Sequence, residues 1–378
     1  MSRWFWCVST VAVACAIARL GLGADPTALP NSPGPLAGPA PLAVWDATLR
    51  ATAGGGYRHN VLRTSVAPES SGFVAAAGDL SVMRLAESGA QATFLFMGED
   101  TRYLDAPSVD KEQWFSGTAE ASWPLGPADQ VGGWLQYFYQ NQVVDVSETE
   151  VELRRVLIEG HGVSVRPEWQ HTLWPGWHLK LEGTMHRQFY RATLDQYWEG
   201  AGRLGLTHEY GRRSEWSVGF QSRHRFYDTR LQYDQQAQPI PGTRLVYWQP
   251  ELTGAWRHHW DANRHWRTTT RLSLMLNRDN GSGYFDYNRL LVAQQLRWSR
   301  GGWQATTQAR LGWYRYDLQR ITGQRRYRAY CELDLRLERR LGKHGLLYAA
   351  AQREWDFSND PLDEYRDWMA SAGLGAEF

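Results

Sequence analysis

Strict alternation of apolar and charged residues is the feature of this chain that most limits its fold. In the segment 327–340, YRAYCELDLRLERR, every second residue from Tyr327 to Leu337 is apolar or small, and most of the residues between them are charged. A helix would place apolar residues three and four positions apart, so a period of two indicates a β-strand. One face of this strand needs apolar surroundings, and the other needs water or partner charges.

The composition excludes several classes of protein. The 378 residues contain 41 Lys and Arg against 40 Asp and Glu, and a net charge of +1 argues against nucleic acid as a partner. The mean hydropathy is −0.53, and no apolar stretch after the N-terminus is long enough for a membrane helix. The aromatic content is high, at 13% with 20 Trp, and aromatic residues are enriched in strands and at membrane–water interfaces.

The N-terminus has the layout of a secretory signal peptide. A basic start is followed by an apolar run over residues 4–18 and then by small residues, which predicts that residues 1–24 are a signal peptide cleaved after Ala24. Residues 25–43 are rich in proline and are predicted to form a periplasmic linker, with a small plug inside the barrel described below as the alternative. Cleavage leaves Cys331 as the only cysteine, so no disulfide is expected.

From residue 44 onward, segments with a period of two are separated by short and long connections in turn. We predict about sixteen strands, with 14 or 18 as alternatives, which begin near residues 44, 73, 91, 113, 131, 151, 177, 197, 214, 244, 264, 285, 303, 325, 346 and 365. Every second connection is tight, as at Gly301-Gly302, and carries the residues that hairpin turns require. The others, such as 59–72 and 229–243, are longer and polar. The pattern predicts an all-β fold, a transmembrane up-and-down antiparallel β-barrel over residues 44–378.

Aromatic residues at both ends of one strand face favour a membrane-spanning barrel over a soluble β-protein. Trp303 and Trp313 lie on the same face, and the residues between them span roughly 26 Å along the barrel axis at a tilt of about 40°. A membrane barrel has an apolar belt about 25 Å tall, with an aromatic girdle at each edge. The predicted girdle residues are Trp45, Tyr57, Trp177, Phe189, Trp198, Tyr210, Trp216, Phe226, Trp303, Trp313, Trp368 and Phe378.

The end of the chain resembles that of Gram-negative outer-membrane β-barrels, whose last strand ends in Phe after apolar residues at alternate positions. The residues in this phase are Trp368, Ala370, Ala372, Leu374, Ala376 and Phe378. The segment GGGYRHNV, residues 54–61, also resembles the opening of bacterial barrels of unassigned role. The resemblance implies a location in the cell outer membrane, contact with its lipid, and recognition of the C-terminal strand by the barrel assembly machinery.

The charged strand faces are expected to line the interior, because a Lys or Arg at the lipid midplane costs about 2–4 kcal/mol. Arginine supplies most of the positive charge, and it binds carboxylate and phosphate groups in a bidentate manner. This composition favours small anionic or sugar-like solutes, and the alternative is that opposite charges pair only with each other and stiffen the wall. The candidate residues are Lys180, Glu182, Arg203, Arg223, Arg225, Arg267, Arg271, Arg310, Arg328, Glu332, Asp334 and Arg336.

We predict a passive channel for small hydrophilic solutes, on the resemblance to porins in strand number. The connection after the fifth strand, VVDVSETE, is short, so the constriction loop that porins carry there is not expected. The alternatives are a structural or export-partner barrel without free diffusion, and an enzyme of the barrel surface. No enzyme, metal or cofactor is expected, because the sequence has neither the His-x-Ser-Asn-Gly run of outer-membrane phospholipases nor metal-spaced Cys and His. His258-His259 and residues 277–281 are interpreted as a rim feature and an outer loop.

Overall fold

The computed structural model describes residues 44–85, 89–146, 155–191 and 194–378. The predicted signal peptide and Pro-rich linker lie outside these ranges, as does most of the connection after the fifth strand. Within the described ranges no helix is long and apolar enough to cross a membrane, and this finding bears on helices alone.

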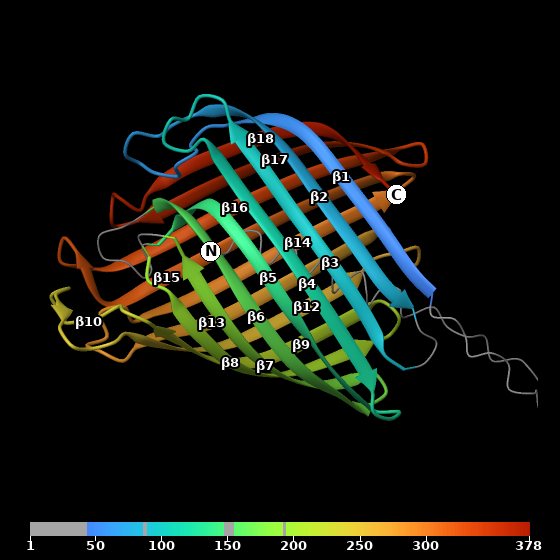
Figure 1. The fold of residues 1–378 in the computed structure, drawn as a ribbon, viewed down its shortest axis with the longest axis horizontal. Coiled ribbons are helices and arrows are strands. Elements are labelled where there is room, and N and C mark those ends of the chain that lie inside the picture. The colour runs from blue at the N-terminus through green and yellow to red at the C-terminus, as the bar shows by residue number, and fades with distance from the viewer. Residues whose placement is uncertain (1–43, 86–88, 147–154, 192–193) are drawn as a thin grey trace, which may run out of the picture. The chain divides into compact units, whose positions relative to one another are not determined.

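Sixteen antiparallel strands form a closed barrel, in which each strand pairs with its neighbours in the chain (Figure 1). The strands are β1 (Val44–Arg58), β2 (Ser71–Leu85), β3 (Gln91–Tyr103), β4 (Lys111–Pro124), β5 (Asp129–Asp145), β6 (Arg155–Trp174), β7 (Trp177–Tyr190), β8 (Tyr197–Tyr210), β9 (Ser214–Tyr227), β12 (Val246–His259), β13 (Trp266–Asp279), β14 (Tyr287–Arg300), β15 (Trp303–Ile321), β16 (Gln324–Leu341), β17 (Gly345–Ser358) and β18 (Tyr365–Glu377). The prediction of sixteen strands is confirmed, and every strand begins within four residues of its predicted start. Pairing of β1 with β18 closes the barrel.

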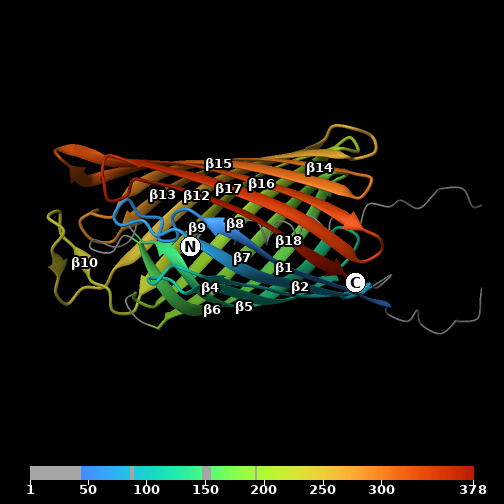
Figure 2. The ribbon, with the colours of Figure 1, turned by 90° about the horizontal axis from the view of Figure 1, so that it is seen from above.

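The connections differ between the two ends of the barrel, as Figure 2 shows from a second direction. At one end, which we call the short-turn rim, strands are joined by tight turns such as Gly301-Gly302, whose positive φ angles of 58° and 79° suit a two-residue hairpin. The other end, the long-loop rim, carries the longer connections. One of these contains a small hairpin of β10 (Gln232–Tyr233) and β11 (Pro239–Ile240), which is too short to be seen as a periodic pattern in the sequence.

Along each strand, every second residue points outward, and most of these outward-facing residues are apolar. In β16, Leu335 and Leu337 are 45% and 43% exposed, whereas Glu332 and Glu338 are buried. Because Cβ atoms alternate between the two faces of a sheet, the even-numbered residues of β16, such as Glu332 and Glu338, face the interior. A closed barrel whose outer surface is made of exposed leucine, valine and aromatic side chains is a membrane-spanning barrel.

Substitution of Leu335 by Arg is expected to destabilise the barrel by about 2–4 kcal/mol, because it places a charge on the lipid face near the middle of β16. Equilibrium unfolding by urea in phospholipid vesicles measures the loss. The matched control is Gln352→Arg on β17, which faces inward and already donates to Glu332 Oε1 at 2.9 Å. We expect less than about 1 kcal/mol there, and an equal loss in both variants would contradict the assignment of the two faces.

The interior at the long-loop rim is packed by loops and large side chains. Val61, in the connection between β1 and β2, is fully buried and packs with Phe73 of β2, Tyr103 of β3, Val143 of β5 and apolar residues of the loop between β3 and β4. The glycines of the GGGYRHNV segment permit close packing beneath this cluster. A Cβ atom on Gly54 would lie 2.4 Å from Tyr348 Oη, and one on Gly56 would lie 2.6 Å from the ring of Phe73. The sequence GGGY thus lets the side chains of Tyr348 and Phe73 approach the backbone of β1 closely.

Candidate functional site

The twelve residues proposed from the sequence for the interior all lie on the strand face opposite the exposed apolar side chains. Most of them belong to ion-pair clusters that join neighbouring strands. Their exposure depends on height in the barrel. The side chains of Arg203 and Arg336 are each 39% exposed, whereas Arg328, which lies nearer the long-loop rim, is only 7% exposed. The charged groups in the middle of the barrel and toward the short-turn rim are therefore the ones that a solute in the interior could contact.

One cluster connects β6, β7 and β8. Lys180 Nζ lies 2.9 Å from Glu168 Oε2 and 3.3 Å from Glu182 Oε1. Glu182 also forms ion pairs with Arg166 at 3.3 Å and with Arg203 at 3.6 Å. Three cations here share two carboxylates, so the cluster carries one net positive charge.

A second cluster connects β8, β9, β12 and β14. Glu199 accepts a hydrogen bond from Arg225 at 3.0 Å and forms an ion pair with Arg223 at 3.3 Å. Glu251 accepts Arg289 at 3.4 Å and lies 4.0 Å from Arg223. The ring of Tyr197 lies 4.4 Å from the guanidinium carbon of Arg225, and this adds a cation–π contact. Three arginines again share two carboxylates.

The alternating segment 327–340, which forms most of β16, takes part in a third cluster. Arg310 on β15 lies 2.9 Å from Glu332 Oε2 and 3.5 Å from Asp334 Oδ2. Gln352 on β17 donates to Glu332, so the charges of β16 are held from both sides. This part of the wall fits the interpretation that interior charges pair with each other.

Two further arginines of β16 form ion pairs with carboxylates, one on β17 and one on β16 itself. Arg328 lies 2.5 Å from Asp356 of β17, and the pair is buried. Arg336 lies 2.7 Å from Glu338 of its own strand, and Glu338 also pairs with Arg50 of β1. The pair of Glu338 and Arg50 therefore spans β17 and β18, the two strands between β16 and β1.

The arginines of β13 and β14 form a surface that we call the basic wall, defined as Arg267, Arg271, Arg289 and Arg297. Arg267 and Arg297 are directly opposite each other in the register of the two strands, and Arg271 is opposite Ala293. The only carboxylate of inward parity on these two strands is Asp279, which lies at the loop end and accepts three backbone N–H groups of the loop 280–286. The basic wall therefore has more positive charge than its own strands can balance.

The structure also contains an acidic wall that was not predicted from the sequence. It consists of the inward-facing carboxylates Asp79 of β2, Glu99 of β3, and Glu112 and Glu120 of β4, and these three strands have no inward-facing Lys or Arg. In the closed order of sixteen strands, β3 and β13 are eight strands apart, so the acidic wall faces the basic wall across the interior. The signal that could have identified Glu99 as inward-facing is its spacing, since it lies an odd number of positions from Phe94 and Phe96, which are exposed on the outer face.

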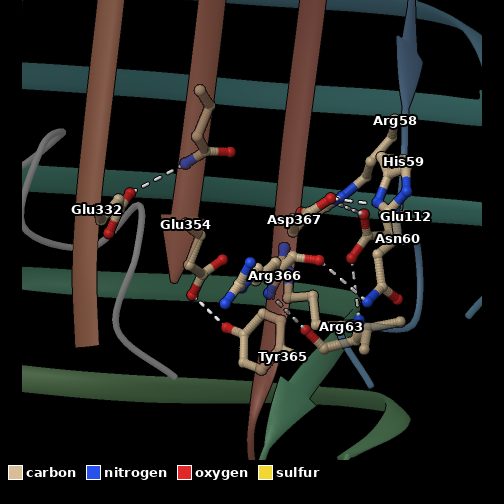
Figure 3. A network of polar contacts seen from close by, with 12 residues as sticks. Arg58, His59, Asn60, Arg63, Glu112, Glu332, Glu354, Tyr365, Arg366 and Asp367 are labelled. Carbon is tan, nitrogen blue, oxygen red and sulfur yellow. Dashed lines mark hydrogen bonds and ion pairs between the residues drawn. The ribbon is translucent and has the colours of Figure 1, made fainter. Parts of the chain in front are cut away.

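A buried polar network holds the place where the first and last strands meet, as Figure 3 shows. Arg58 of β1 donates to Asp367 Oδ2 of β18 at 2.8 and 2.9 Å and to Glu112 Oε2 at 3.2 Å. The backbone N–H of Asn60 donates to the second oxygen of Asp367 at 3.1 Å. The side chains of Arg58 and Asp367 are only 4% and 3% exposed. The contacts give both charges partners within the protein and link residues 309 positions apart in the chain.

Nine of the twelve proposed girdle residues are exposed, and Trp177, Phe189 and Trp216 are half-buried. Trp177 contacts its neighbours on the outer face, with its ring centroid 4.1 Å from that of His208 and 5.5 Å from that of Trp216. Their packing against each other explains the lower exposure of the two tryptophans.

The two histidines that we interpreted as a rim feature lie at the end of β12, at the short-turn rim. His258 stacks on Trp256 and contacts Trp260 edge-on, with ring centroids 5.5 and 4.7 Å apart. In the following turn, the backbone N–H of Trp266 donates to Asp261 and lowers the pKa of that carboxyl. Among the described residues, no group of three or more His, Cys, Asp or Glu side chains is arranged to hold a metal ion.

The fold and the outer surface define the class of this protein: a sixteen-stranded, membrane-spanning β-barrel of porin-like architecture. No protein-family model and no curated protein matches the chain.

Solved structures with a similar fold include OprD of Pseudomonas aeruginosa, at 9% identity over 88% of this chain and 95% of that one, with a TM-score of 0.46. OccAB1 of Acinetobacter baumannii has 8% identity over 88% and 96% of the two chains and a TM-score of 0.44. An anion-selective porin of Comamonas acidovorans has 11% identity over 89% and 100%, with a TM-score of 0.46. At such low similarity, the specificities of these proteins do not transfer to this chain.

Proposed function

We propose that this protein is a passive channel of the outer membrane that favours small anionic hydrophilic solutes. The observation that carries the proposal is the charge of five consecutive strands, β9 and β12 to β15. Their inward-facing arginines are Arg223, Arg225, Arg257, Arg267, Arg271, Arg289, Arg297 and Arg310, against the carboxylates Glu215, Glu251 and Asp279. A barrel of sixteen strands is wide enough for an aqueous channel.

The two charged walls give the interior a transverse electric field. A small anion is attracted to the basic wall, and a solute with both a cationic and an anionic group is oriented with its anion toward Arg271 and its cation toward Asp79. Guanidinium groups suit this role, because they keep their charge at any physiological pH and offer paired N–H donors to carboxylate or phosphate. The solute can leave as easily as it enters, since it exchanges one charged partner for the next along the wall.

Conductance of the purified protein in planar bilayers tests the proposal. We expect stepwise conductance in potassium chloride and a reversal potential that indicates preference for chloride in a salt gradient. In liposome swelling assays, small anionic sugars should enter faster than neutral or cationic sugars of the same size. A folded, inserted protein without conductance would overturn the proposal.

The partner-barrel alternative depends on residues 25–43, which lie outside the described part of the chain. Deletion of this segment is expected to leave conductance unchanged if the barrel is a passive channel, whereas loss of capture of a periplasmic protein would favour the alternative.

We also propose that the C-terminal strand, which ends in the exposed Phe378, is the segment that the assembly machinery recognises.

A further inference from the structure

A groove of about 730 Å³ lies on the outer face of the barrel, over β9 and β12 to β16. Most of its lining residues are at outward-facing positions, and its floor is apolar, with Phe220, Leu252, Leu274, Leu290 and Trp313. A volume of this size is typical of sites that hold a bound molecule. The groove is thus a concave site on a surface that faces lipid.

The groove coincides with an irregularity in the sheet. Pro250 of β12 lines the groove and has no N–H to donate to a neighbouring strand. The ladder between β12 and β13 pairs Trp248 with Arg278 and Glu251 with Met275, and it lacks the pairs between them. The side chain of Gln249 instead donates to Asn277 at 2.8 Å.

The end of the groove toward the long-loop rim is polar and basic. Asn288, Arg315 and Tyr327 are directly opposite one another on β14, β15 and β16, and all three face outward and line the groove. Arg325 lies two residues from Tyr327 on the same face of β16, about 7 Å away along the strand. In the described part of the chain, the guanidinium groups of Arg315 and Arg325 form no hydrogen bond or ion pair with protein.

Carboxylates near this end of the groove do not balance the two arginines. Asp317 lies 3.4 Å from Arg278 Nη1, and Asp286 lies 3.9 Å from Arg278 Nε. Both acids therefore have a partner other than Arg315 and Arg325, and the local surface keeps a surplus of positive charge at the level where the apolar belt ends.

We propose that this groove binds an anionic lipid of the leaflet on the long-loop side, with its acyl chains on the apolar floor and its phosphate on Arg315 and Arg325. Charge complementarity decides for a lipid over a second copy of this chain, since an identical surface would bring these arginines against each other across a two-fold axis. Asn288 and the hydroxyl of Tyr327 add neutral hydrogen-bonding groups beside the phosphate position. Arginine is the residue best suited to hold such a group.

Native mass spectrometry of the purified full-length protein in neutral detergent tests the proposal with three probes: dilauroyl phosphatidylglycerol, dilauroyl phosphatidylcholine and inorganic phosphate. We expect retained phosphatidylglycerol on the wild type and a roughly tenfold weaker retention in the double variant R315Q/R325Q. The matched control is R353Q/R366Q, which removes two outward-facing arginines of β17 and β18 that do not line the groove and should retain the lipid. L274W, which fills the groove without touching a charge, should also lose the lipid.

Three results would overturn the proposal: equal retention of phosphatidylcholine, equal loss in both double variants, or displacement of the lipid by inorganic phosphate at equal concentration. A dimer that R315Q/R325Q stabilises would identify a second copy as the occupant and would also overturn it. Heat-dependent migration on a detergent gel verifies that each variant is folded before it is scored.

Discussion

Reversal of charge at Arg267 and Arg271 is expected to convert an anion-preferring channel into a cation-preferring one. The double variant R267E/R271E changes the charge of the basic wall by four units while leaving the apolar face of β13 unchanged. A unit charge about 4 Å away in water contributes roughly 1 kcal/mol, so the ratio of anion to cation permeability should fall at least about fivefold. Reversal potentials in a potassium chloride gradient measure this ratio directly, and substitutions on the inner face of a barrel alter selectivity without loss of the fold.

The matched control for this experiment is R212E/R213E. These arginines are exposed in the turn between β8 and β9 at the short-turn rim, and the control changes the formal charge by the same amount. Charges more than about 8–10 Å from the permeation path are screened at physiological salt, so we expect a smaller shift that disappears as salt is raised. An equal shift in the control would place the selectivity at the rim instead of at the basic wall. No shift in R267E/R271E would contradict the assignment of the basic wall as the surface that solutes meet.

Substitution of Arg58 by Met is expected to destabilise the barrel by about 3–5 kcal/mol. It leaves Asp367 as a buried carboxylate with no cation at 2.8 Å, at the place where β1 and β18 close the barrel. Glu112 loses one of its partners in the same step, although Tyr103 Oη at 2.7 Å and the backbone N–H of Val143 at 3.0 Å still donate to it. Equilibrium unfolding in phospholipid vesicles measures the loss, and the heat-modified gel shift of the variant should occur at a lower temperature.

Two variants separate the buried charge from general effects of removing an arginine. Arg102→Met removes an arginine that is 48% exposed and pairs with Asp100, and it should cost no more than about 1 kcal/mol. The double variant R58M/D367L removes both members of the buried pair and should recover part of the lost stability, because no isolated charge remains. If R58M proves as stable as the wild type, the network in Figure 3 is not what holds the closing strands.

Much of the architecture could be predicted because it depends on local alternation. Side chains of a strand point alternately to its two faces, so Leu335 and Asp334 are assigned to lipid and interior once the strand is recognised. Turn residues such as Gly301 and Gly302, with positive φ, mark the hairpins in the same local way. The β10–β11 hairpin could not be found, since two residues per strand are too few to display a period.

The sequence by itself therefore determined the number of strands, which face of each is apolar, and the end at which the long loops lie. Only the tertiary structure decided which charges meet. Arg58 and Asp367 pair because β1 and β18 close the barrel, and Glu99 faces the basic wall because eight strands separate β3 from β13 on a ring of sixteen. The physical reason is that the direction of a side chain follows from its own backbone. Its partner across the interior follows from the register, tilt and closure of all the strands together.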